Sequence, residues 1–276
     1  MTRLSVNGVR LEVRSGGHGP PLLLLHGFTG SGAGWAPHLA AFRRSHRTIV
    51  VDLLGHGRSD APTDPARYAI ERQADDLFDL ARDVGAAPVD VVGYSMGARI
   101  ALQLAIDHPR AVRRLVLESP SAGIADPAGR VRRRTADEAL ATTIERDGVV
   151  AFVDRWADQP MFASHAGLPT ATRARLRRQR LGHTPLGLAN ALRGGGQGAM
   201  APLEDRLATV RAPTLVLTGS LDPAGRERAA AVARGIPGSH LEVVEGAGHT
   251  AHLERPAVFR RLVLAFLAGS PARSTH

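Results

Sequence analysis

One stretch of the chain, residues 89–107, limits the folds that the rest can adopt. Apolar Val89–Val92 predicts a strand, Gly93–Gly97 (GYSMG) a tight turn, and Met96–Asp107 a helix. A serine at such a turn takes a strained backbone conformation. Glycine at positions 93 and 97 permits the turn, because a Cβ at either position would collide with the opposite arm. Ser95 Oγ then stands clear of the sheet, which is typical of a nucleophile.

Short apolar strands alternate with helical segments on both sides of this stretch. Such alternation predicts a parallel sheet with helices on both faces, and therefore an α/β fold. Asn7-Gly8 suits a two-residue turn with positive φ, so Arg3–Val6 and Val9–Arg14 should form an antiparallel hairpin at one edge. The further strands expected are Leu22–Leu25, Thr48–Val51, Val89–Val92, Arg114–Leu117, Thr214–Leu217 and Leu241–Val244. The expected helices beside them are Trp35–Phe42, Ile70–Val84, Met96–Asp107, Arg226–Arg234 and Pro256–Leu267.

The alternation breaks after residue 118 and resumes after residue 200. The intervening segment is rich in Arg and Ala and contains no convincing strand, so we expect a helical cap inserted into the sheet domain. An independent domain is the alternative, but the resumed alternation favours an insertion. The expected division is core 1–118, cap 119–200, core 201–268 and a flexible tail 269–276. The expected cap helices are Thr135–Ile144, Val149–Trp156, Thr170–Leu181 and Leu186–Leu192.

Composition excludes several classes of protein and site. The chain has 276 residues, 43% hydrophobic and 22% charged, as soluble globular proteins do, and no apolar run reaches the roughly 18 residues that a membrane helix needs. The N-terminus lacks the apolar segment of a signal peptide, so we expect a cytoplasmic protein with no membrane partner. The absence of cysteine removes disulfides and thiol nucleophiles. Nothing in the sequence indicates an oligomeric state.

The basic residues carry information about the partner. The formal net charge is +9, and all 35 basic residues are arginine because the chain contains no lysine. Nucleic-acid binding would favour a dense basic run interleaved with aromatic residues, whereas aromatics are 4% and the arginines are spread widely, so we expect no nucleic-acid partner. Two clusters, Arg130–Arg134 and Arg173–Arg180, lie in the expected cap. Because the planar guanidinium suits carboxylates, they favour an anionic small-molecule substrate.

A serine hydroxyl needs an imidazole base within hydrogen-bond reach, and the imidazole needs a carboxylate to orient it. His249 lies in a glycine-rich turn after the last expected strand, and Asp222 lies in the loop after the strand before it. Both should therefore lie with Ser95 at the carboxyl edge of the sheet. His252 is the alternative base, and Glu118 is the alternative acid.

An oxyanion hole needs two backbone N–H groups directed at one point. Met96 follows the serine, and Phe28 lies in the loop after the neighbouring strand, so their N–H groups are the candidates. No metal site is expected, since the spacing of His26, His56 and Asp52 follows turn chemistry. No Gly-rich dinucleotide fingerprint opens a helix after the first strand, and we expect no cofactor.

These motifs together resemble the α/β-hydrolase superfamily over nearly the whole chain, in which the order Ser, Asp, His is characteristic. Four segments carry a closer resemblance, to the 2-succinyl-6-hydroxy-2,4-cyclohexadiene-1-carboxylate synthase family of menaquinone biosynthesis. They are HGFTGS at 26–31, GYSMGAR at 93–99, ESPSAG at 118–123 and LRGGGQG at 192–198. The first two are shared with many hydrolases, and the last two are more specific.

The resemblance implies an α/β-hydrolase fold with lyase activity. In that family the serine abstracts a proton α to the succinyl carbonyl of 2-succinyl-5-enolpyruvyl-6-hydroxy-3-cyclohexene-1-carboxylate, and the enolpyruvyl group leaves as pyruvate. It follows from the resemblance that Ser95 acts as the base through His249 and that Asp222 orients the imidazole. The N–H groups of Phe28 and Met96 would stabilise the enolate oxygen.

The resemblance also implies which residues bind a substrate with several carboxylates. Matching the family's positions places Arg133, Trp156 and Arg180 in the cap, with Tyr94 and Arg99 beside the turn as further contacts. Two other functions stay open, because one fold serves many reactions. One is a serine hydrolase of esters, lactones or C–C bonds on a carboxylate-bearing small molecule. The other is a non-enzymatic binding protein, which an intact set of Ser, His and Asp disfavours.

Overall fold

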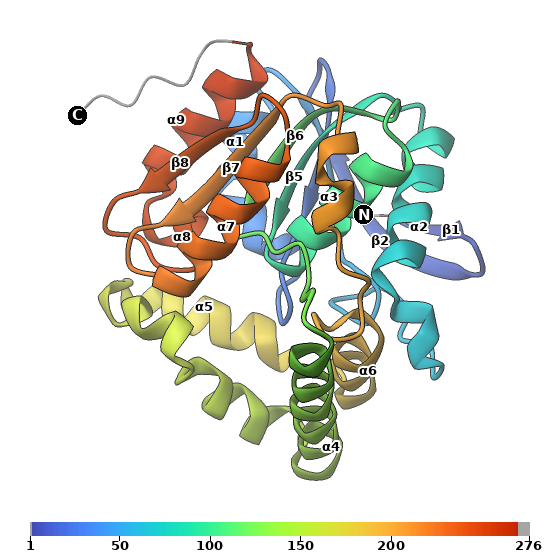
Figure 1. The fold of residues 1–276 in the computed structure, drawn as a ribbon, viewed down its shortest axis with the longest axis vertical. Helices are drawn as coiled ribbons and strands as arrows, with labels where there is room; N and C mark the ends of the chain where they lie inside the picture. The colour runs from blue at the N-terminus through green and yellow to red at the C-terminus, as the bar shows by residue number, and fades with distance from the viewer. Residues whose placement is uncertain (1, 270–276) are drawn as a thin grey trace.

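The computed structural model describes residues 2–269, and at its centre is an eight-stranded sheet (Figure 1). The strand order is β1-β2-β4-β3-β5-β6-β7-β8. β1 and β2 are antiparallel at one edge, β2 is antiparallel to β4, and β3 to β8 are parallel. The bounds are β1 Thr2–Val6, β2 Val9–Gly16, β3 Pro21–Leu25, β4 Arg47–Val51, β5 Val89–Tyr94, β6 Val112–Glu118, β7 Thr214–Gly219 and β8 His240–Val244. The predicted α/β fold class is confirmed.

Helices cover both faces of the sheet, and the strand side chains divide alternately between two cores. In β3, Leu23 and Leu25 pack into the core shared with α2 and α3, whereas Leu22 and Leu24 pack into the core shared with α1 and α9. A strand that is apolar at every position is therefore buried on both sides. Outside the segment between β6 and β7, the helices are η1 Gly32–Trp35, α1 Ala36–Phe42, η2 Pro65–Tyr68, α2 Ile70–Asp83, α3 Met96–Asp107, η4 Glu204–Thr209, α7 Pro223–Gly235, α8 Ala251–Glu254 and α9 Pro256–Leu267.

The predicted edge hairpin is present. Asn7 and Gly8 form its turn with φ angles of 44° and 81°, and Val6 pairs with Val9 across it. Positive φ at both central residues matches the twist of the flanking strands, which explains why Asn-Gly is favoured there.

Between β6 and β7 the chain forms helices that lie together beyond the carboxyl ends of the parallel strands (Figure 1). They are α4 Pro127–Ala157, η3 Pro160–Gly167, α5 Thr170–Leu181 and α6 Pro185–Gly195. Ile144 and Phe152 from α4 pack with Leu188 and Leu192 from α6 in a small apolar core of their own. We call these four helices the cap helices.

The prediction for the first cap helix is wrong about where the helix begins. Instead of starting at Thr135–Ile144, α4 starts at Pro127, because both carboxylate oxygens of Asp126 accept hydrogen bonds from the first turn. The arginine-rich first turns have no apolar stripe, so periodicity could not reveal them. The break expected before Val149–Trp156 is present at Gly148, whose φ of 80° interrupts the helical geometry.

The C-terminal part of the chain matches its prediction as far as the structure describes it. α9 spans the predicted Pro256–Leu267. The tail predicted to be flexible, 269–276, lies outside the described residues except for Gly269. Within residues 2–269, no helix is both long and apolar enough to span a membrane.

Candidate active site

The turn between β5 and α3 holds Ser95 in a conformation that non-glycine residues rarely adopt, with φ 53° and ψ −106°. A Cβ on Gly93 would lie 2.4 Å from Gly97 O on the opposite arm, as predicted. A Cβ on Gly97 would instead lie 2.5 Å from Leu25 O, at the end of β3. The collision predicted with the opposite arm is therefore corrected for Gly97, whose missing side chain lets α3 approach the neighbouring strand.

Ser95, His249 and Asp222 form a hydrogen-bonded chain. Ser95 Oγ lies 3.1 Å from His249 Nε2, and His249 Nδ1 lies 2.8 Å from Asp222 Oδ2. Because a carboxylate only accepts, Nδ1 carries the proton and Nε2 is free to accept the serine proton. Each residue follows the carboxyl end of a parallel strand, β5, β7 or β8. The geometry suits proton transfer from Ser95.

Asp222 is held as a charged, orienting acid. It caps α7, with Oδ1 accepting from Gly225 N–H at 2.9 Å while Oδ2 accepts from His249. Burial by itself would raise the pKa of Asp222, but the hydrogen bonds from His249 and Gly225 outweigh it and leave the pKa below its usual value. Asp222 therefore stays ionised at neutral pH and stabilises a protonated His249.

His252, the alternative base, and Glu118, the alternative acid, pair with each other. Glu118 Oε1 accepts from His252 N–H at 2.9 Å and lies 3.0 Å from His252 Nδ1, and Glu118 is fully buried. The next residue, Ser119, donates its hydroxyl to His249 O at 2.9 Å. The end of β6 thus anchors the loop that carries His249. Glu118 O also accepts from Ser95 N–H at 2.9 Å, whereas within residues 2–269 neither alternative side chain hydrogen-bonds to the Ser95 hydroxyl.

A cavity of about 570 Å³ opens beside Ser95, between the sheet and the cap helices. Phe28, Met96 and His249 line it on the sheet side, and Arg133, Trp156, Pro160, Met161, Leu192 and Gln197 line it from the cap segment. Among residues 2–269, no acceptor takes a hydrogen bond from the N–H groups of Phe28 and Met96. Both groups are thus available to a ligand oxygen, as an oxyanion hole requires.

Two of the predicted arginines line this cavity and are partly engaged by the protein. Arg99 is buried on α3 and donates to Gly195 O at 2.6 Å, and burial lowers its pKa to about 10. Arg133 Nε donates to Asp137 Oδ1 at 2.9 Å. Both guanidiniums keep further N–H groups for a ligand.

The structure places the five predicted substrate contacts in two cavities. Arg99, Arg133 and Trp156 line the cavity beside Ser95, but Tyr94 and Arg180 line a smaller adjoining cavity of about 50 Å³. Arg180 lies in the smaller cavity because its side chain packs against an aromatic ring. The Arg180 guanidinium carbon lies 5.0 Å from the centre of the Phe162 ring, and burial lowers the pKa of Arg180.

The Tyr94 ring packs against two histidine rings. Its centre lies 5.5 Å from the His249 ring and 4.8 Å from the His252 ring. Phe28 lines both cavities, and its ring meets Trp156 edge to face at 5.4 Å. Tyr94 therefore packs between the His249 ring and the smaller cavity, and Phe28 borders both cavities.

Sequence reasoning missed four polar residues of the larger cavity, Ser119, Ser121, Gln197 and Arg228. The first three lie inside the segments ESPSAG and LRGGGQG, so those motifs could have identified them. Arg228 lies in none of the recognised motifs, and only its place on the helix after Asp222 could have suggested that it lines the cavity.

His26 and Asp52, which directly follow β3 and β4, accept hydrogen bonds that hold the turns after these strands. His26 Nε2 accepts from Leu53 N–H at 2.9 Å, and Asp52 Oδ1 accepts from Gly32 N–H at 2.7 Å. Burial lowers the pKa of His26 to about 4, so this histidine is neutral. Within the described part of the chain, no three His, Asp or Glu side chains are grouped to hold a metal ion.

Comparison with known proteins agrees with this geometry. A model of the alpha/beta hydrolase fold family matches residues 20–256. The chain is 38% identical, over 95% of its length and 96% of the relative, to a provisionally named 2-succinyl-6-hydroxy-2,4-cyclohexadiene-1-carboxylate synthase of Bacillus subtilis (strain 168). It is 31% identical, over 86% of its length and 90% of the relative, to the synthase of that name from Salmonella paratyphi C (strain RKS4594).

Solved structures of two named proteins share this fold. MenH from S. aureus superposes with a TM-score of 0.90 at 31% identity, covering 98% of this chain and 99% of that one. The enol-lactonase from Burkholderia xenovorans LB400 superposes with a TM-score of 0.84 at 27% identity, covering 97% and 100%. The chain therefore belongs to the α/β-hydrolase fold family, and within it resembles the 2-succinyl-6-hydroxy-2,4-cyclohexadiene-1-carboxylate synthases.

Proposed function

We propose that this protein is a carbon–oxygen lyase that eliminates pyruvate from 2-succinyl-5-enolpyruvyl-6-hydroxy-3-cyclohexene-1-carboxylate in menaquinone biosynthesis. The observation that carries the proposal is the combination of Ser95 within 3.1 Å of His249 Nε2 and an adjoining cavity lined by arginines. A proton-abstracting group beside guanidiniums suits a substrate that bears carboxylates. The relatives named as synthases support the same reaction.

In the proposed mechanism, Ser95 transfers its hydroxyl proton to His249 Nε2 and takes the proton from the ring carbon next to the succinyl carbonyl. The electrons move through the ring to form a second double bond, and the C–O bond to the enolpyruvyl group breaks. Enolpyruvate leaves, takes up the proton from His249 and tautomerises to pyruvate. Asp222 keeps Nδ1 protonated and stabilises the imidazolium.

Charge develops on the succinyl carbonyl oxygen as the proton leaves. The N–H groups of Phe28 and Met96 are the donors for this oxygen, and removing one such donor typically costs about 10²–10³ in kcat. Arg99 and Arg133 orient the substrate through its carboxylates. An anionic small molecule is accordingly the partner proposed for this site.

The test is pyruvate release from the enolpyruvyl precursor by the purified protein, measured alongside a panel of p-nitrophenyl esters. We expect pyruvate release in the wild type. In the Ser95→Ala and His249→Ala variants we expect kcat to fall by about 10³–10⁴, with Asp222→Asn similarly affected through the wrong imidazole tautomer. A fully active His249→Ala protein would mean that another residue is the base.

A serine hydrolase of esters, lactones or C–C bonds is the second candidate. It is favoured by the Ser95–His249–Asp222 geometry, which equally suits attack on a carbonyl, and by the likeness to an enol-lactonase. Efficient ester turnover without pyruvate release would select this candidate. A protein inactive in both assays would instead support a binding function.

A further inference from the structure

Three arginines line the cavity beside Ser95, and they differ in what holds them. Arg99 donates to Gly195 O, and Arg133 is paired with Asp137. Arg228, which is half-buried, has no hydrogen-bond or ion-pair partner within residues 2–269. It is thus the cavity arginine whose side-chain N–H groups are not engaged by any other of these residues.

Arg228 reaches the cavity from α7, the helix that Asp222 caps. Ala224, one turn earlier on the same helix face, also lines the cavity, so α7 presents this face to the ligand space. Leu221 lines it from the preceding loop and is 57% exposed, which places this side of the cavity at its opening. The three guanidiniums therefore come from three different elements, α3, α4 and α7.

Asp222 caps the helix that carries Arg228, but its two oxygens already accept from His249 and Gly225. Burial raises the pKa of Asp222, whereas the hydrogen bonds and the charges of His249 and Arg228 lower it. Arg228 thus acts on Asp222 through space without binding it. Its five N–H donors remain for a ligand.

We propose that Arg228 binds a carboxylate of the substrate at the cavity opening and so makes this site selective for substrates with at least two separated carboxylates. This inference rests on the proposed function for the identity of the substrate. Arginine forms two parallel charge-assisted hydrogen bonds with a carboxylate, which gives orientation as well as affinity. Arg228 is a specificity-determining residue in this scheme, and the proton transfer itself remains with Ser95 and His249.

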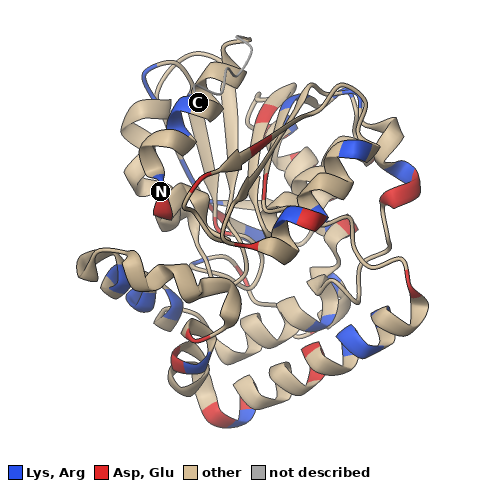
Figure 2. Cartoon of the chain, turned by 60° about the vertical axis from the view of Figure 1, so that its left-hand side comes forward, with Lys and Arg blue, Asp and Glu red and all other residues tan. Residues whose placement is uncertain are grey.

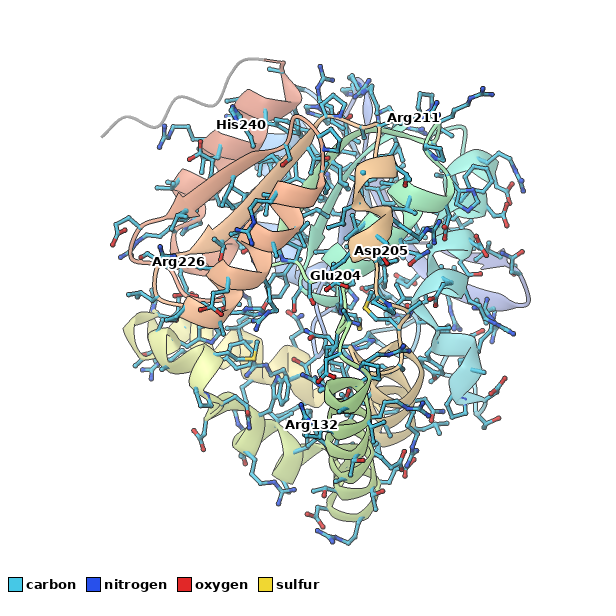
Figure 3. The ribbon with its side chains drawn as sticks, viewed as in Figure 1. Arg132, Glu204, Asp205, Arg211, Arg226 and His240 are labelled. Atoms are coloured by element: carbon cyan, nitrogen blue, oxygen red, sulfur yellow. The ribbon has the colours of Figure 1, made fainter. Side chains whose placement is uncertain are left out.

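The first test measures binding without turnover. In a Ser95→Ala background, calorimetry with the enolpyruvyl precursor compares Arg228→Gln with Arg226→Gln. Arg226 is the matched control because it is exposed on the same helix and does not line the cavity (Figure 3). We expect Arg228→Gln to weaken binding about 10-fold or more, Arg226→Gln to change it less than about twofold, and Arg228→Lys to recover part of the loss. Equal affinities in the two Gln variants would overturn the proposal.

The second test separates this inference from the proposed reaction. It compares the mono-p-nitrophenyl ester of glutaric acid with p-nitrophenyl pentanoate, a pair that differs in one terminal carboxylate. We expect Arg228→Gln to lower the ratio of kcat/KM values, carboxylate ester over neutral ester, with Arg226→Gln leaving it unchanged. If Arg228 acted only through Asp222, both esters would slow equally, and the proposal would fail even if the enzyme released pyruvate. A changed ratio in a protein that releases no pyruvate would sustain the selectivity while rejecting the lyase.

Discussion

At the Ser95 turn, the choice of glycine at positions 93 and 97 is dictated by close backbone contacts. Ser95 accepts a φ of 53° because Gly93 and Gly97 leave no Cβ where the arms and β3 meet. Such strain is tolerated only where the surrounding structure imposes it. The gain is a hydroxyl that points away from β5 toward His249.

The Gly97→Ala variant tests this constraint. Its Cβ would lie 2.5 Å from Leu25 O, a backbone atom that cannot move away without disturbing β3. We expect the free energy of unfolding to fall by about 2–3 kcal/mol in urea titrations, with loss of activity. Gly167→Ala is the control, because a Cβ there meets nothing within 4 Å. A Gly97→Ala protein as stable as the control would show that the turn is not close-packed.

Among the elements, the loop between β8 and α8 is held by one carboxylate, that of Glu254, the last residue of α8. Glu254 accepts from Gly248 N–H at 2.8 Å and from Thr250 N–H at 3.1 Å, the two residues that flank His249. From the cap helix η3, His165 Nε2 lies 2.6 Å from Thr250 Oγ1. The loop that carries His249 is therefore held jointly by the sheet domain and the cap helices.

The Glu254→Gln variant should loosen that loop, because an amide has one acceptor oxygen for donors on both sides of His249. We expect kcat to fall about 10-fold with KM little changed, since His249 moves while the arginines that line the cavity do not. Glu204→Gln is a suitable control, as Glu204 is exposed on η4 (Figure 3). An effect on KM alone would contradict a positioning role.

At the scale of the whole molecule, charge is arranged differently on the surface and in the interior. Basic residues of the cap lie along its helices (Figure 2), while the core buries several histidines in neutral form. Burial lowers the pKa of His26 to about 4, of His38 to about 3 and of His165 to about 4. These groups couple the stability of the fold to pH.

The sign of this coupling follows from the lowered values. Between about pH 6.5 and pH 4 the unfolded chain binds protons on these histidines that the folded chain does not, so acidification stabilises the unfolded state. We expect the free energy of unfolding to fall between pH 7 and pH 5, by on the order of 2 kcal/mol for each such histidine. His38→Leu should reduce this pH dependence in urea titrations. Replacing exposed His240 by Asn should not, and equal slopes in both variants would contradict the assignment (Figure 3).

Much of the fold was predictable because its signals are local. The apolar strand Leu22–Leu25, the Asn7-Gly8 turn and α5 at Thr170–Leu181 each follow from neighbouring residues, and the structure places them where predicted. The start of α4 was not predictable from periodicity, since its first turns are stabilised by capping at Asp126 rather than by an apolar face.

The sequence by itself determined the strand–turn–helix around Ser95 and the chain order of Ser95, Asp222 and His249, because each follows a strand whose pattern is local. Only the tertiary structure decided that Glu118 pairs with His252 and that Arg228 faces the cavity while Arg180 packs on an aromatic ring. The physical reason is that arginines carry the same charge wherever they stand. Which of them meets a ligand depends on the contacts that neighbouring elements, distant in sequence, leave unfilled.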